Sequence, residues 1–487
     1  MKSAAEKRCD LSMDIVNNYT LLCDFYELTM ANGYYKTGYK DKICYFDMFF
    51  RNNPDNGGFA IACGLDQVIE YIQNLNFSNE DIAFLRSKNC FDEGFLEYLK
   101  TFKFTGDIYA VPEGTVVFPN EPMITVRAKA IEAQIIETFI LLTVNHQSLI
   151  ATKANRIVRS SKGRPVMEFG ARRAQGSAAS VLGARAAYIG GCAGTSCTLA
   201  EKMYTVPAGG TMAHSWVQMF DTEYDAFYAY ASTYPDNCTL LVDTYNVLKS
   251  GVPNAIKVFK ELGITKCAIR LDSGDITYLS KKARAMLDEA GMINCKIVAS
   301  NSLDEYIIRD IIIQGASLDS FGVGERLITS ESDPVFGGVY KLVAVEDSNR
   351  NVIPKIKISE NPTKITTPHF KKVYRIYCED MKKAEADLIC VYDEVIDTSK
   401  PLTIFDPDYT WKKKTFENFT VKELLVPVFK NGICVYDRPS VKAIRKYCEK
   451  QIYEQWEEVK RFENPHNYYV DLSEKLWNIK YQMLNKD

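Results

Sequence analysis

Residues 266–275 read "KCAIRLDSGD", and this stretch decides the fold class. Its apolar first half predicts a buried strand, and its polar second half predicts a loop that opens a helix near residues 276–290. The alternation continues through a strand at 295–300, a helix near 303–314 and a strand at 318–324. Parallel strands need such helical crossovers, so this region predicts a β-α-β-α-β arrangement in one parallel sheet.

Seven apolar segments between residues 165 and 325 end in a similar polar or glycine-rich loop. They read "PVMEFGARR", "AAYIGGCAGTS", "GGTMAHS", "TLLVDTYN", "CAIRLDSGD", "KIVASNSLDE" and "SLDSFGVGE". Seven such units predict a closed, irregular TIM-like α/β barrel, whose active site would lie at the carboxyl ends of the strands. A doubly wound open sheet is the structural alternative.

The N-terminal third of the chain predicts a different organisation. Residues 20–36 have the apolar spacing of a helix, and residues 40–125 mix strands with a long loop rich in Pro, Asn and Gly. Residues 131–161 then predict a long helix. We therefore place the first domain boundary after residue 130, with the barrel over residues 131–345.

The C-terminal part resembles residues 40–125 in composition. It predicts hairpins around residues 347–349 and within 426–437, followed by a helix over 440–462. We expect residues 1–130 and 346–487 to form together a second α/β domain that flanks the barrel, with the terminal helices as its structural cover.

Composition and charge exclude several classes of function. The 487 residues are 46% hydrophobic and 25% charged, with a net charge of −3, so no basic field favours nucleic acid or anionic lipid. The fourteen cysteines form no C-x-x-C pair, which predicts reduced thiols rather than a zinc site. The N-terminus lacks the apolar core of a signal peptide, and "IIETFILLTV" is too short to span a bilayer. These features predict a cytoplasmic protein with no nucleic-acid or membrane partner.

The loop "RLDSGD" carries the clearest chemistry. Arg270 offers a planar cation suited to phosphate or carboxylate, and Asp272 offers a carboxylate for ribose hydroxyls or a metal. Ser273 and Gly274 would expose backbone N–H groups at the start of a helix, an arrangement that binds anions. The alternative is that Asp272 or Ser273 merely caps that helix.

Two further loops suit an anionic substrate. In "SFGVGERLITS", Gly322 and Gly324 would let the backbone approach a phosphate, although a tight turn explains them equally well. In "MEFGARRAQG", Phe169 is a candidate for stacking on a flat ring, and Arg172 and Arg173 are candidates for contacting an anion.

His214 is one of only four histidines and lies in "GGTMAHSW". A buried histidine with satisfied ring nitrogens is the structural interpretation. Because His214 lies near these loops, we favour the functional interpretation, in which the imidazole accepts a proton or a phosphoryl group.

These motifs resemble the nicotinate phosphoribosyltransferase family, among the type II phosphoribosyltransferases. "LLCDFYELTMANGYY", "EFGARRAQG", "GTSCTLA", "GTMAHSW", "RLDSGD", "SNSLDE" and "FGVGERLITS…GGVYKLV" follow one another in the family's order. The resemblance implies transfer of phosphoribosyl from phosphoribosyl pyrophosphate to nicotinate, giving nicotinate mononucleotide and pyrophosphate, in NAD biosynthesis. It also implies ATP as a co-substrate and Mg²⁺ or Mn²⁺ with the polyphosphates, with metal ligands that the sequence leaves open.

The resemblance also implies roles for individual residues. His214 matches the histidine that ATP phosphorylates, and Asp272 is the second expected catalytic residue. Tyr26 matches an aromatic residue that reaches the partner subunit's nicotinate site, which implies a homodimer with shared active sites. The remaining expected positions are substrate-binding Phe169, Arg172, Thr211, Ser215 and Arg270, and phosphate-binding Ser273, Gly274, Gly322, Gly324 and Thr329.

Three residues bear on alternatives. The related nicotinamide enzyme has Asp where this chain has Ser196, and an Asp would repel nicotinate's carboxylate, so Ser196 favours the acid. Glu325 departs from the family's usual Thr and is unfavourable beside phosphate unless it points away or pairs with Arg326. Trp216 is bulkier than is usual two residues after the histidine.

Three other functions remain as alternatives. They are a nicotinamide phosphoribosyltransferase, a catalytically weakened paralogue that acts as a binding protein, and a Schiff-base barrel aldolase. The aldolase is disfavoured because no lysine lies at the strand ends, apart from those beginning helices.

Overall fold

A computed structural model describes residues 18–378 and 382–485, which fold as two compact units. Within the described residues, the first unit combines 18–148 with Val335–Pro439 and 450–485, so N-terminal and C-terminal segments both contribute to it. The second unit is Leu149–Pro334 with Ser440–Glu449. These boundaries differ from the predicted ones, since residues 131–148 and 335–345 pack with the first unit and Ser440–Glu449 with the second.

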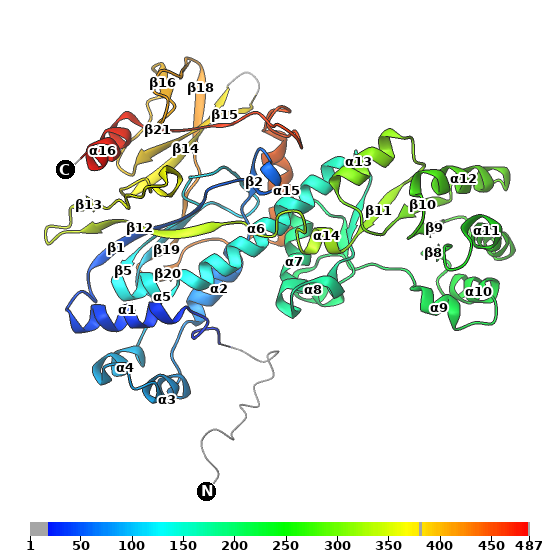
Figure 1. Ribbon diagram of the computed structural model, residues 1–487, viewed down its shortest axis with the longest axis horizontal. Coiled ribbons are helices and arrows are strands. Elements are labelled where there is room, and N and C mark those ends of the chain that lie inside the picture. The colour runs from blue at the N-terminus through cyan, green and yellow to red at the C-terminus, as the bar shows by residue number, and fades with distance from the viewer. Residues whose placement is uncertain (1–17, 379–381, 486–487) are drawn as a thin grey trace, which may run out of the picture. The chain divides into compact units, whose positions relative to one another are not determined.

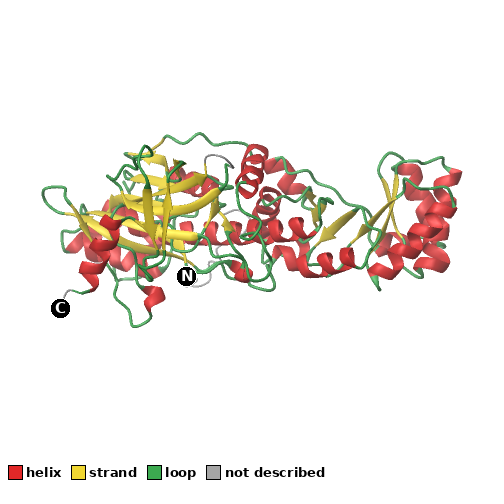
Figure 2. Cartoon of the chain, turned by 90° about the horizontal axis from the view of Figure 1, so that it is seen from above, coloured by secondary structure: helices red, strands yellow, loops and turns green. Residues whose placement is uncertain are grey.

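The second unit is built on a parallel sheet of six strands, in the order β7-β6-β11-β10-β9-β8 (Figure 1). The last strand of this region, β11, pairs with the first, β6, as the ends of a barrel do. Figure 2 shows helices packed along one side of these strands. The strands are β6 (Val166–Glu168), β7 (Gly194–Thr195), β8 (Cys238–Leu241), β9 (Cys267–Leu271), β10 (Lys296–Ala299) and β11 (Ser320–Val323).

The predicted barrel is open at one seam. The segment "GGTMAHS" was expected to form its own strand, but within the described residues its neighbourhood contributes a single bridge between Ala208 and Thr195. No described hydrogen-bonded ladder joins β7 to β8. Gly209 and Gly210 disfavour a regular strand here, because glycine supplies no side chain to pack. The sheet is therefore a curled, six-stranded half-barrel and not a closed seven-stranded one.

Capping side chains place the helices directly after the polar loops. The Asp275 carboxylate accepts from Tyr278 N at the start of α12, and the Asp304 carboxylate accepts from two backbone N–H groups at the start of α13. Gly291 follows α12 with φ of 80°, a conformation that glycine adopts without strain. The helices that lie wholly within this unit are α7 (Ser177–Ile189), α8 (Thr198–Tyr204), α9 (His214–Gln218), α10 (Glu223–Thr233), α11 (Val252–Glu261), α12 (Ile276–Glu289), α13 (Glu305–Ile313) and α14 (Glu325–Ile328).

The first unit interleaves strands from the two ends of the chain. Its seven-stranded antiparallel sheet has the order β13-β12-β1-β5-β3-β19-β20. Strand β1 (Ile43–Phe50), "ICYFDMFF", is buried along nearly its whole length, and β12 and β5 pair with its two edges. The others are β3 (Asp107–Ala110), β5 (Ile124–Lys129), β12 (Gly338–Glu346), β13 (Val352–Pro354), β19 (Val426–Lys430) and β20 (Ile433–Cys434).

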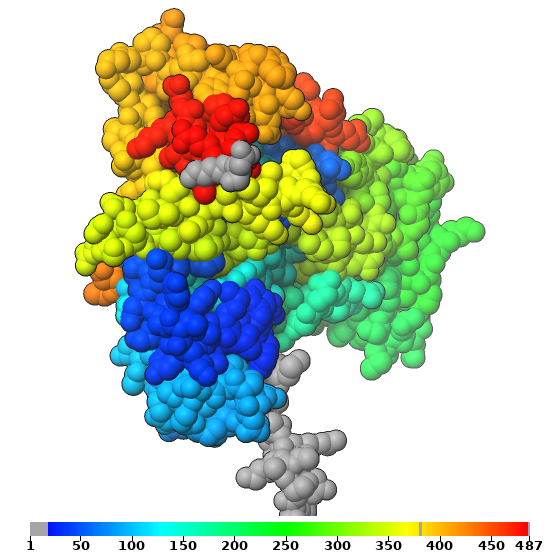
Figure 3. Space-filling view, turned by 60° about the vertical axis from the view of Figure 1, so that its left-hand side comes forward, coloured from blue at the N-terminus to red at the C-terminus, as the bar shows by residue number. Residues whose placement is uncertain are grey.

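This sheet confirms two sequence predictions. β12 with β13, and β19 with β20, are the expected hairpins. Early and late segments also share one face of the unit, as the blue, yellow and red surfaces in Figure 3 show. A second sheet has the order β18-β14-β15-β21, from Phe419–Glu423, Lys371–Cys378, Ala384–Val391 and Tyr469–Leu472.

The remaining helices follow the expected pattern with changed bounds. The helix predicted over 20–36 is α1 (Phe25–Lys36), and the one predicted over 131–161 divides into α5 (Ala130–Ile135) and α6 (Glu137–Ser160). Residues Ala130–Ser160 are long and apolar enough to cross a membrane, but 72% of their most apolar window is buried inside the protein, as in a core helix. The helix predicted over 440–462 ends early, as α15 (Val441–Tyr453).

Candidate active site

A pocket of about 240 Å³ lies where the carboxyl ends of β6, β9, β10 and β11 meet. Three arginines line it, so we call it the arginine pocket. Parallel strands bring their carboxyl ends to one edge, which is why residues far apart in sequence converge here. Its lining residues are Phe169, Arg172, Arg173, Arg270, Asp272, Ser300, Asn301, Ser302, Gly322, Gly324 and Glu325.

His214 stands beside two carboxylates next to this pocket. Its Nε2 lies 3.8 Å from Asp272 Oδ2 and 4.0 Å from Asp243 Oδ1, and its Nδ1 lies 3.1 Å from Thr244 Oγ1. The imidazole is 40% exposed, so a substrate can reach it. The structure thus brings together the two residues expected to be catalytic, His214 and Asp272.

Asp243 is the residue that the sequence prediction missed. Its side chain is 1% exposed, and Oδ2 accepts from Asp272 N at 3.0 Å and from Ser273 Oγ at 2.6 Å. The signal was present: Asp243 ends "TLLVD" as Asp272 ends "AIRLD", and the pairing of Leu241 with Arg270 sets the two level across β8 and β9.

Arg270 and Thr211 also come together as expected. Arg270 Nη1 donates to Thr211 Oγ1 at 2.6 Å, and Nη2 donates to Met212 O at 3.1 Å. Burial lowers the pKa of Arg270, although the nearby carboxylates oppose this, and its Nε is buried without a hydrogen-bond partner. The guanidinium thus fixes the irregular segment before His214 and keeps an unused donor.

Gly322 and Gly324 make room for Phe169 and its backbone. A Cβ at Gly322 would overlap the Phe169 ring, with Cε2 only 2.6 Å away, and one at Gly324 would lie 3.3 Å from Phe169 O. The half-buried ring therefore packs closely against Gly322 of β11 at the pocket wall. Gly322 thus permits this close packing and also lines the pocket, and its predicted approach to a phosphate stays a prediction.

Glu168 is a second residue that sequence reasoning did not select. Fully buried at the end of β6, it accepts from Thr195 Oγ1 at 2.6 Å and from Gly170 N. Burial raises the pKa of Glu168 despite these hydrogen bonds. The carboxyl holds the loop of Phe169 against the loop that carries Ser196, whose N donates to Glu168 O at 2.8 Å.

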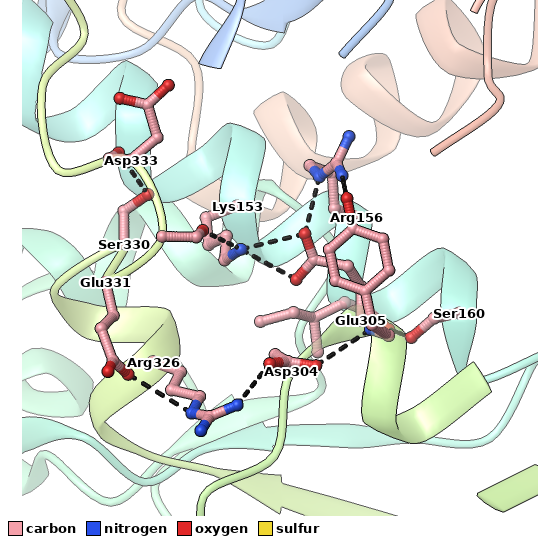
Figure 4. Close-up of polar contacts among 12 residues, drawn as sticks. Lys153, Arg156, Ser160, Asp304, Glu305, Arg326, Ser330, Glu331 and Asp333 are labelled. Carbon is pink, nitrogen blue, oxygen red and sulfur yellow. Dashed lines mark hydrogen bonds and ion pairs between the residues drawn. The ribbon is translucent and has the colours of Figure 1, made fainter. Parts of the chain in front are cut away.

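Glu325 has a different partner from the one that the sequence suggested. Its Oε2 lies 3.6 Å from Arg173 Nε, and its Oε1 accepts from Ser302 Oγ at 3.2 Å. Arg326 instead pairs with Asp304 and with Glu331 (Figure 4). Glu325 therefore lines the pocket within reach of a cation, which reduces its repulsion of an anion.

The other predicted positions do not line the arginine pocket, apart from those already described. Ser273 Oγ binds Asp243, and the true cap of α12 is Asp275, so the alternative of a capping Asp272 or Ser273 is wrong. Thr329 Oγ1 donates to Glu325 O at 2.7 Å within its own turn. Ser215 is exposed on α9, and Tyr26 is 45% exposed on α1 of the first unit.

A buried ionic cluster joins α6 to α13 (Figure 4). Lys153 Nζ and Arg156 Nε, both from α6, lie 2.9 and 2.8 Å from the carboxylate of Glu305, the first residue of α13. Lys153 Nζ also donates to Ser332 Oγ at 2.8 Å. The cluster ties α6 to the segment after β10 and to the one after α14.

Trp216 packs inside the unit. Its Nε1 donates to Ala226 O at 3.0 Å, and its ring contacts Phe220 and Tyr230. The bulky side chain therefore anchors α9, and with it His214, to α10.

Known proteins share this sequence and architecture. Models of the nicotinate phosphoribosyltransferase N-terminal domain, family and C-terminal domain match residues 21–145, 165–392 and 370–480. The nicotinate phosphoribosyltransferase of Bacillus subtilis is 45% identical over 96% of both chains. The chain belongs to the nicotinate phosphoribosyltransferase family.

Two solved structures are similar to this fold. The crystal structure of human nicotinic acid phosphoribosyltransferase matches with a TM-score of 0.84 and 27% identity, covering 94% of this chain and 99% of that one. A nicotinate-nucleotide pyrophosphorylase from Pyrococcus furiosus matches with a TM-score of 0.69 and 25% identity, covering 89% and 95%.

Proposed function

We propose that the protein transfers phosphoribosyl from phosphoribosyl pyrophosphate to nicotinate, giving nicotinate mononucleotide and pyrophosphate, and that ATP hydrolysis is coupled to the transfer. The observation that carries the proposal is His214 beside Asp243 and Asp272, next to a pocket lined by three arginines. His214 supplies a nucleophile for the phosphoryl group of ATP, and the arginine pocket supplies cations for the anionic substrates.

The pocket suits both substrates of the transfer. Arg172, Arg173 and Arg270 attract the phosphates and the nicotinate carboxylate, and the Phe169 ring offers a face for the pyridine. Glycosyl transfer develops positive charge on the ribosyl carbon as pyrophosphate leaves. Catalysis then consists mainly of holding the two reactants in line and balancing charge.

His214 is placed to accept a phosphoryl group. In the tautomer whose Nδ1–H donates to Thr244 Oγ1, Nε2 keeps its lone pair for attack and lies within 4.0 Å of the two carboxylates. Nε2 attacks the γ-phosphorus of ATP, and the bond to the β-phosphate oxygen breaks to release ADP. The phosphohistidine adds negative charge and acceptor oxygens at the pocket edge, which changes affinity for the pyrophosphate substrate.

The carboxylates fit a divalent cation. Asp243 Oδ1 is buried without a hydrogen-bond partner, and Mg²⁺ or Mn²⁺ is commonly held by one or two carboxylates together with substrate phosphates. Asp243 and Asp272 would hold such an ion, which would neutralise polyphosphate charge. The described residues contain no group of three or more acidic, His or Cys side chains arranged as a metal site, so substrate phosphates and water would supply the remaining ligands.

Substrate choice, assembly and location complete the proposal. Ser196 is exposed and uncharged, so it does not repel the nicotinate carboxylate.

Helix α1 carries an exposed apolar surface, on which Phe25, Tyr26 and Met30 are 51%, 45% and 39% exposed. This surface is suited to a homodimer in which Tyr26 reaches the partner's site. The protein is proposed to act in the cytoplasm.

Turnover tests the proposal. Purified protein is given phosphoribosyl pyrophosphate and Mg²⁺ with nicotinate or nicotinamide, with and without ATP, and His214→Ala is run alongside. We expect nicotinate to be used, ATP to accelerate the reaction, and the variant to lose that acceleration. Preference for nicotinamide would contradict the inference from Ser196. If ATP is not hydrolysed and no mononucleotide forms, the alternative of a binding protein is favoured.

A further inference from the structure

A second pocket of the same unit adjoins the arginine pocket. It has a volume of about 330 Å³ and lies between the loops after β9 and β10 and the helices α12 and α13. Asn301 and Ser302 line both pockets, so the two share a wall. Asn301 has φ of 120°, a conformation rare for a residue with a side chain, which marks this shared wall as a constrained loop.

The chemistry of the second pocket differs from that of the first. Ile276 and Leu303 are 8% and 3% exposed, and Ile307 and Ile311 add half-buried apolar surface. Among the described residues that line it, Asp275 alone is charged and no cation is present. Gln314 adds an amide that both donates and accepts hydrogen bonds. Such a pocket suits a flat, uncharged ring with polar edges and disfavours phosphate.

We propose that this second pocket, the base pocket, binds the purine base of ATP; the inference rests on the proposed ATP coupling. Phosphoribosyl pyrophosphate is a polyanionic sugar and nicotinate carries a carboxylate, so ATP alone among the three substrates brings an uncharged heteroaromatic ring. From the base pocket, the triphosphate extends past Gly274 and Ser302 toward Asp272, which lies 3.8 Å from His214.

Two substitutions on α13 give a matched test. Ile311→Arg places a long cation in the base pocket, whereas Ile313→Arg places the same side chain at a position that is 75% exposed and does not line it. Because Ile311 is half-buried, Gln314→Ala at an exposed position gives a second variant that the fold tolerates. The probes are non-hydrolysable β,γ-methylene ATP and inorganic tripolyphosphate, each titrated with Mg²⁺ by calorimetry.

We expect Ile311→Arg to weaken the nucleotide analogue about tenfold and to leave tripolyphosphate unchanged, since only the nucleotide carries a base. Gln314→Ala should give a smaller loss of the same selectivity, and Ile313→Arg should change neither affinity. The proposal is overturned if the two pocket variants keep wild-type affinity for the analogue, or if both probes weaken equally. Wild-type protein that binds the two probes equally would overturn the base pocket alone, whereas wild-type protein that binds neither would overturn ATP coupling itself.

Discussion

At the scale of single residues, Asp243 shows how a buried carboxylate organises an exposed site. It accepts hydrogen bonds from the backbone of Asp272 and the hydroxyl of Ser273, and its second oxygen faces His214. One side chain thus orients the loop that carries its neighbouring carboxylate and also sets the charge beside the imidazole.

Asp243→Asn tests this role. The amide keeps the shape but removes the charge, so we expect the ATP-coupled kcat to fall by about 10²–10⁴-fold, as for carboxylates that orient a catalytic histidine. KM for nicotinate should remain close to wild type, because Asp243 does not line the arginine pocket. Steady-state kinetics gives both values. Asp225→Asn, at an exposed position of α10, is the control, and an equal loss in both variants would contradict the assignment.

Gly322→Ala tests the seating of the Phe169 ring. The added methyl group would occupy the space of that ring, so the ring must move away from the wall. We expect KM for nicotinate to rise about tenfold and stability to fall by about 1–3 kcal/mol. Gly33→Ala is the matched control, since a Cβ there meets nothing within 4 Å. Unchanged KM in Gly322→Ala would show that Phe169 does not position the pyridine.

At the scale of elements, the buried cluster of Lys153, Arg156 and Glu305 holds α6 and α13 together. The side chains of Lys153 and Glu305 are 2% and 0% exposed. Removing the charge of one therefore leaves the buried charge of the other only partly compensated.

Lys153→Met is expected to destabilise the protein by about 3–5 kcal/mol in urea denaturation. The control Lys257→Met removes an exposed pair with Glu261 on α11 and should cost less than about 1 kcal/mol. Equal midpoints for the two variants would mean that the buried cluster contributes nothing beyond a surface pair.

Elements also show what the sequence could predict. The strand and loop of "KCAIRLDSGD" were predictable because apolar runs and turn residues act locally. The absence of a strand at Gly209–Gly210 and the partner of Glu325 were not predictable. Both depend on which distant segment of the chain lies beside these residues. Asp243 was missed for the same reason: its importance comes from the register of β8 against β9, which no single stretch encodes.

At the scale of the whole molecule, stability responds to pH through Glu27 of α1. This side chain is fully buried, and burial raises the pKa of Glu27 to about 8 although hydrogen bonds from Thr138 oppose the shift. Because the folded pKa exceeds the unfolded one, the contribution of Glu27 is complete below about pH 4.5 and is lost as pH rises toward 8.

Glu27→Gln removes this dependence because the amide stays neutral. Relative to the wild type, the variant should gain stability as pH rises from 5 to 8, by at most about 1.4 kcal/mol per pH unit for one proton. Thermal denaturation across this range measures the difference. Glu80→Gln, at an exposed position of α3 (Asn79–Ser87), should parallel the wild type, and a parallel curve for Glu27→Gln would refute the prediction.

Because the sheets pair strands that lie far apart in sequence, some strands are synthesised long before their partners. β1 ends at Phe50 but its neighbour β12 begins at Gly338, and β6 ends at Glu168 while its neighbour β11 begins at Ser320. At about 5–20 residues per second on the ribosome, β1 waits roughly 15–60 s for that partner and β6 roughly 8–30 s. Throughout this interval an apolar strand edge stands unpaired in the nascent chain. The nascent chain is therefore open to wrong edge-to-edge strand pairing until about two thirds of it has been synthesised.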